Sequence, residues 1–156
     1  MPQPDHVIYM RDDPYTLAAE GTVEYQYFTV DPGWKEDKWI QAAEARPDNR
    51  AVVHHIIAFI TPPSSGRARG GLLAGYAPGG GVRVNPPGVA TLVPAGSKIT
   101  FQMHYTPNGT ATEDITRVQM QFVEESAVTH EVFTLSAVDQ EFEIPPHAGD
   151  FTVPMH

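Results

Sequence analysis

The chain has 156 residues, enough for one ordinary domain, and 41% of them are hydrophobic, which suffices for a packed core. Its formal net charge of −9 argues against nucleic acid or an anionic membrane surface as the main partner, and no apolar run is long enough to span a membrane. Cysteine is absent, which excludes disulfides, thiolate metal sites and cysteine nucleophiles.

Four strands are predicted in the first 60 residues, because β-branched and aromatic residues recur there in alternating or continuously apolar runs. Residues 11–20, between the first two strands, are polar and contain Pro14, so we predict no helix there. Residues 38–45 fit a helix as well as a strand, and the neighbouring strands favour a strand. The four predicted strands are residues 6–10, 22–30, 38–45 and 51–60.

Residues 64–88 lack periodicity and contain several Gly-Gly and Pro-Pro pairs, so one long Gly/Pro-rich loop is predicted. Five further strands are predicted after it, at residues 90–93, 98–105, 116–123, 130–135 and 141–144. Short strands punctuated by fifteen prolines and thirteen glycines indicate an all-β fold, a jelly-roll β-sandwich of about eight to ten mostly antiparallel strands. We expect residues 1–145 to form a single domain and residues 146–156 a C-terminal tail.

Two adjacent histidines, His54 and His55, lie inside the apolar run AVVHHIIAFI. This run is apolar on both alternating faces, which predicts a central strand that is buried on both sides. A buried imidazole pair needs hydrogen bonds or a metal ion, and the simplest alternative is one hydrogen-bonded core histidine beside one that points outward. Because neighbouring strand residues face opposite ways, a shared ion requires a bulge or a strand end at this position, or two rings that reach round to it with different nitrogens.

A third histidine, His104, lies in the strand predicted at residues 98–105. A neighbouring strand that carries this imidazole would complete a three-histidine metal site. Three neutral imidazoles without a thiolate suit copper or zinc, and the spacing of the residues does not separate these two metals.

Two motifs resemble the copper type II, ascorbate-dependent monooxygenases, which include peptidylglycine α-hydroxylating monooxygenase and dopamine β-monooxygenase. They are VVHHIIAF at residues 52–59 and GSKITFQMHY at residues 96–105. The stretches YAPG at residues 76–79 and PAG at residues 94–96 are similar to the bacterial members. The resemblance covers roughly residues 23–123.

The resemblance implies that His54, His55 and His104 bind one type 2 copper, the electron-transfer copper of the family's amino-terminal domain. It also implies a small-molecule reductant such as ascorbate and a periplasmic or secreted location, although no signal peptide is visible. Gln102 and Tyr105 become candidates for residues that orient the imidazoles from outside the ligand shell.

The chain departs from the family in the second copper site, which is formed there by a second domain with a His-x-His pair and a distant methionine. No His-x-His sequence occurs in this chain. We therefore expect no substrate hydroxylation by this chain alone. The resemblance implies either a partner domain carrying the second copper or self-association through the face around the first.

The remaining histidines, His6, His130, His147 and His156, are predicted to be surface or structural residues, and Met103 a core residue. Three functions follow, in order of preference. The first is a single-copper electron-transfer domain, and the second is a non-catalytic β-sandwich for binding or assembly with structural histidines. The third is oxidase or peroxygenase chemistry at the lone copper.

Overall fold

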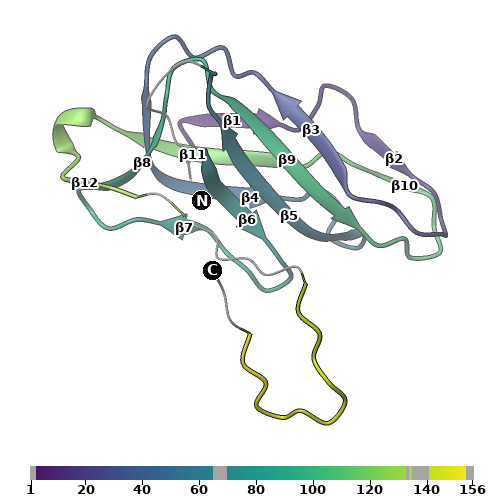
Figure 1. The fold of residues 1–156 in the computed structure, drawn as a ribbon. Coiled ribbons are helices and arrows are strands. Elements are labelled where there is room, and N and C mark those ends of the chain that lie inside the picture. Colours follow the sequence, from purple (N-terminus) through teal and green to yellow (C-terminus); the bar gives the residue numbers. More distant parts are fainter. Residues whose placement is uncertain (1–2, 65–69, 133, 135–140, 154–156) are drawn as a thin grey trace.

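The computed structural model describes residues 3–64, 70–132, 134 and 141–153. In this part of the chain there are twelve strands, one short 3-10 helix (η1, Glu125–Ala127) and no α-helix. Two large sheets pack face to face as a β-sandwich (Figure 1). The all-β prediction is therefore confirmed. Within the described residues, no helix has both the length and the apolar character needed to cross a membrane.

The larger sheet has six strands in the order β1-β11-β4-β8-β12, with β7 paired to β4. Its strand pairs are antiparallel except for β8 and β12, which run parallel. The strands are β1 (His6–Tyr9), β4 (Lys38–Arg46), β7 (Arg83–Val84), β8 (Val89–Val93), β11 (Arg117–Val123) and β12 (His130–Glu131).

The smaller sheet has four antiparallel strands in the order β3-β9-β5-β6. They are β3 (Gln26–Val30), β9 (Lys98–Tyr105), β5 (Val53–Thr61) and β6 (Gly71–Tyr76). The predicted central position of the histidine strand is confirmed, because β5 lies between β9 and β6 (Figure 1). A separate pair is formed by β2 (Tyr15–Leu17) and β10 (Thr112–Asp114).

The core lies between the two sheets and follows the period-two alternation of the strands. In β9, the side chains of Phe101, Met103 and Tyr105 are almost fully buried, so the core role predicted for Met103 is confirmed. Burying each such side chain stabilises the fold by about 1.5–3 kcal/mol. The opposite face of β9 carries His104, which leaves this imidazole on the outer side of the sheet.

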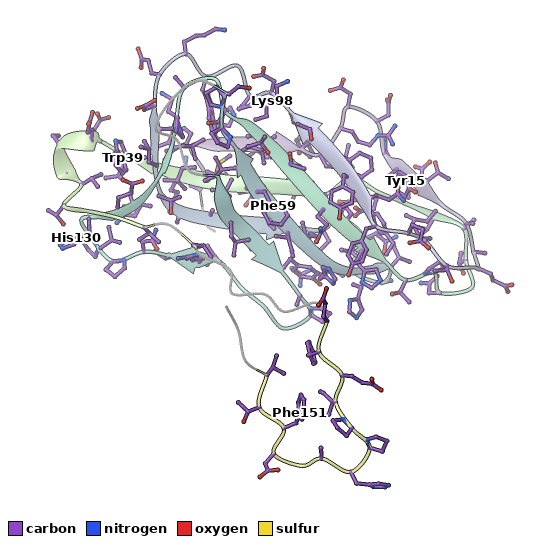
Figure 2. The ribbon with its side chains drawn as sticks, in the orientation of Figure 1. Tyr15, Trp39, Phe59, Lys98, His130 and Phe151 are labelled. Carbon is purple, nitrogen blue, oxygen red and sulfur yellow. The ribbon has the colours of Figure 1, made fainter. Side chains whose placement is uncertain are left out.

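The prediction that β5 is buried on both sides is wrong. Its inward residues are buried, but the outward residues Ile57 and Phe59 are half-buried and His54 is exposed. No further layer of described strands covers this face, on which Phe59 is labelled in Figure 2. The apolar residues on the outward face of β5 therefore form part of a partly open surface and not of a second core.

Two further predictions need correction. The predicted loop at residues 64–88 contains β6 and β7, because Gly71–Tyr76 forms a short apolar strand that pairs with β5. The predicted strand at residues 141–144 is not a strand: these residues are exposed, and the segment extends away from the sandwich (Figure 1). The domain boundary at residue 145 stays a prediction.

Several strand limits differ from the predicted ones by one or two residues, and two differ by more. The strand predicted at residues 22–30 begins only at Gln26, and the one predicted at residues 130–135 is observed as β12. Phe133 and Leu135, in the second of these segments, lie outside the described residues.

Candidate metal centre

The histidine pair lies at a β-bulge where β5 meets β9. Val53 faces Tyr105 and His55 faces His104, so His54 is one extra residue on β5 with no counterpart on β9. A bulge of this kind re-aims the side chains on the longer strand. It removes the objection that neighbouring strand residues point to opposite faces, because both imidazoles turn toward His104.

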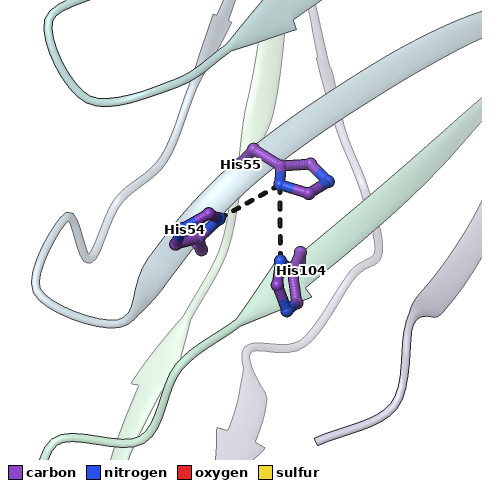
Figure 3. A group of neighbouring side chains, drawn as sticks. All are labelled: His54, His55 and His104. Carbon is purple, nitrogen blue, oxygen red and sulfur yellow. Dashed lines mark hydrogen bonds between the residues drawn. The ribbon is translucent and has the colours of Figure 1, made fainter. Parts of the chain in front are cut away.

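The three imidazoles converge through their Nδ1 atoms (Figure 3). The Nδ1 of His55 lies 3.2 Å from that of His54 and 3.4 Å from that of His104, and one ring nitrogen from each residue lies within 4.8 Å of the other two. Two nitrogens bound at about 2.0–2.1 Å to a tetrahedral ion are roughly 3.3–3.4 Å apart. The distances from His55 to both neighbours therefore match those of a shared ion.

Hydrogen bonding alone satisfies this cluster poorly. A neutral imidazole has either one proton or one lone pair at Nδ1, so His55 cannot make two good hydrogen bonds there at once. A cation that accepts a lone pair from each ring satisfies all three residues. The donor set thus fits a metal ion that prefers nitrogen ligands.

The surroundings favour the neutral, metal-binding form of the imidazoles. Partial burial lowers the pKa of His55, and the positive charges that His104 and His54 would carry lower it further. His54 is exposed and the other two are half-buried, so the centre is open to solvent on one side. Ions and other small solutes can therefore reach it directly.

Tyr25 is a neighbour of the site that the sequence did not reveal. Its ring stacks on His104 at a centroid distance of 4.9 Å and lies 5.7 Å from the ring of His55. The contact limits the rotation of His104. The alternation in residues 22–30 places Tyr25 on one face of a chain segment, but nothing in that pattern places this face beside a histidine on another strand.

The two candidate orienting residues make their hydrogen bonds elsewhere. The side-chain amide of Gln102 donates to the Tyr27 hydroxyl at 2.8 Å. The buried Tyr105 hydroxyl donates to Asp114 at 3.0 Å. Burial raises the pKa of Tyr105, and the negative charge of Asp114 raises it further. Their influence on the imidazoles stays a prediction.

The other described histidines lie apart from the three-histidine group. His6 contacts the rings of Trp34 and Phe122, and His130 lies beside the Thr129 hydroxyl. His147 is exposed in the C-terminal segment, and His156 lies outside the described residues.

The chain was compared with known protein families, with curated proteins and with solved structures, and none of them matches it. The three-histidine group that can hold a metal therefore rests on the geometry of these residues alone.

Proposed function

We propose that His54, His55 and His104 hold one copper ion and that the chain acts as a single-copper, electron-transfer domain. The convergence of three Nδ1 atoms from β5 and β9 supports the metal site. Copper is preferred over zinc because VVHHIIAF and GSKITFQMHY resemble the copper monooxygenase motifs. Three neutral imidazoles by themselves suit either metal.

A copper ion at this site would supply one-electron redox chemistry. The protein contributes ligands on two paired strands, which hold the nitrogens in place with little rearrangement. Exposure of His54 gives a small reductant such as ascorbate access from solvent. By the same resemblance, we propose a periplasmic or secreted location, and a second copper domain or a second copy as partner.

The test begins with a titration of the metal-free chain with Cu(II), followed by calorimetry and electron paramagnetic resonance. We expect one equivalent to bind and the spectrum to show hyperfine structure from several nitrogens. Absence of binding above background would refute the proposed metal centre and favour the alternative of a non-catalytic β-sandwich with structural histidines.

Affinity for Cu(II) alone does not establish a redox role, because nitrogen sites generally prefer copper over zinc. The decisive step is reduction with ascorbate under anaerobic conditions. We expect the ion to stay bound as Cu(I) and to return to the original Cu(II) spectrum on reoxidation. Release of the ion on reduction would contradict electron transfer and retain only a metal site.

A further inference from the structure

A groove of about 690 Å³ runs along the outer face of the four-stranded sheet beside the metal centre. Both His54 and His55 line it, and its volume lies within the range of about 300–1,000 Å³ that is typical of small-molecule sites. Most of its other lining residues are apolar or aromatic: Ile57, Phe59, Leu72, Tyr76, Ala77 and Pro78.

The groove stays open because β6 has a glycine, Gly75, at its next-to-last position. Gly75 faces Ile57 across the strand pair, and opposite residues in an antiparallel pair share one face of the sheet. A Cβ atom added at Gly75 would meet only the Ile56 carbonyl oxygen, at 3.6 Å, an ordinary contact. A larger side chain therefore fits the backbone here and would fill the groove.

The charges around the groove favour an anion at its histidine end. Three neutral imidazoles leave the charge of a bound metal ion uncompensated. The Arg50 guanidinium lies 5.8 Å from the centre of the Tyr76 ring, which also lines the groove. No acidic residue is among the described lining residues, although the whole chain has a net charge of −9.

We propose that this groove binds a monocarboxylate with a medium-length aliphatic chain. Its carboxylate lies at the histidine end, near the metal ion and Arg50, and its chain lies over Ile57, Phe59 and Leu72. Phe59 lies four positions after His55 along β5, a span of about 13 Å at a rise of roughly 3.3 Å per residue. The position of the carboxylate rests on the proposed metal centre, whereas the apolar part of the site does not.

The test compares acetate, butanoate and octanoate as ligands of the copper-loaded chain, by calorimetry. Each methylene that is fully buried strengthens binding by a factor of about four, and the partly open groove should still make octanoate at least about tenfold tighter than acetate. Equal affinities for acetate and octanoate would overturn the proposal and leave the metal centre intact.

The variant Gly75→Leu tests the groove separately from the metal site. We expect this variant to lose most of the advantage of octanoate, while its affinities for copper and for acetate stay unchanged. Gly81→Leu is the matched control, because a Cβ at this exposed glycine meets no atom within 4 Å. If Gly75→Leu binds octanoate as tightly as Gly81→Leu does, the ligand does not occupy the groove.

The metal-free chain distinguishes a failure of this proposal from a failure of the proposed function. We expect octanoate to bind the metal-free chain more weakly than it binds the copper-loaded chain, but still more tightly than acetate binds the metal-free chain. We also expect Arg50→Ala to weaken octanoate binding to the metal-free chain more than the control Arg83→Ala does. If copper does not bind but this pattern holds, the proposed function fails and the carboxylate site remains. Loss of the dependence on chain length overturns the carboxylate site.

Discussion

One additional residue in β5 determines whether the histidine pair can share an ion. In a regular ladder, His54 and His55 would lie on opposite faces of the sheet, and only one of them would meet His104. Because His54 has no counterpart on β9, the strand turns locally and both rings reach the same point. The site therefore depends on backbone register as much as on the presence of three histidines.

The first prediction compares two single-histidine variants. His104→Ala removes one of three convergent ligands, whereas His130 lies beside Thr129 and apart from the group. We expect His104→Ala to weaken copper binding by more than about tenfold, since even residues outside the ligand shell typically contribute about 10–100-fold. A competition titration of the two variants provides the measurement. Equal affinities for His104→Ala and His130→Ala would refute the ligand assignment.

At the scale of the elements, Asp114 ties β10 to the turn that precedes the histidine strand. Its side chain is 1% exposed. It accepts hydrogen bonds from the backbone N–H groups of Asp48 and Asn49, at 3.1 and 2.9 Å. It also accepts them from the hydroxyls of Tyr105 and Thr116, at 3.0 and 2.8 Å. One buried carboxylate thus satisfies four donors from three parts of the chain.

Asp114→Ala should therefore lower the free energy of unfolding by about 3 kcal/mol or more, because buried donors lose a charged acceptor. Glu113→Ala is the control, since the Glu113 side chain is exposed on the same strand and its effect should stay within about 0.5 kcal/mol. Denaturant unfolding of both variants measures the difference. A small and equal effect of the two substitutions would show that the four hydrogen bonds do not stabilise the fold.

His6 on β1 provides a pH-dependent contribution to stability. Burial against Trp34 and Phe122 lowers the pKa of His6, and the positive charge of Lys38 lowers it further. The unfolded chain, with an ordinary pKa of 6.5 at this residue, binds the proton more readily. This contribution is therefore complete above pH 6.5 and is lost as the pH falls toward the lowered pKa of the folded state.

The corresponding experiment compares thermal midpoints of the metal-free wild type and of His6→Phe between about pH 7.5 and pH 5. We expect the wild type to lose more stability on acidification, because phenylalanine keeps the ring packing and has no proton to bind. His55, whose pKa is also lowered, is present in both proteins and cancels in the comparison. Parallel pH profiles would assign the acid sensitivity to other groups.

Strong periodicity made β9 accessible from the sequence, whereas the grouping of the three histidines was predicted mainly from the resemblance of two motifs to the copper monooxygenases. Alternation of apolar residues fixes which face of β9 enters the core, and hence that His104 faces outward. The bulge at His54 and the ring contact of Tyr25 depend on the register between strands, which no single stretch encodes. The β2–β10 pair was missed because each strand has only three residues and its partner is distant in the sequence.

At the scale of the whole molecule, the described residues present one three-histidine group on a sheet face that is partly apolar and open. The monooxygenases that the motifs resemble divide their chemistry between two coppers, the second held by a His-x-His pair and a methionine. No His-x-His sequence occurs in these 156 residues. The His-x-His pair of such a second copper site is therefore absent from this chain.

We accordingly expect this chain alone not to hydroxylate a peptide or catecholamine substrate when copper and ascorbate are supplied. A single copper would carry one electron at a time from ascorbate to oxygen, which gives superoxide. Two superoxide ions and two protons then disproportionate to hydrogen peroxide and oxygen, so no electrons would be coupled to a substrate C–H bond. The assay follows hydroxylated product and peroxide together with a glycine-extended peptide, and copper-loaded His104→Ala is the matched control for peroxide from loosely bound metal. Stoichiometric hydroxylated product without peroxide would show that one copper suffices in this chain and that the proposed electron-transfer role is too narrow.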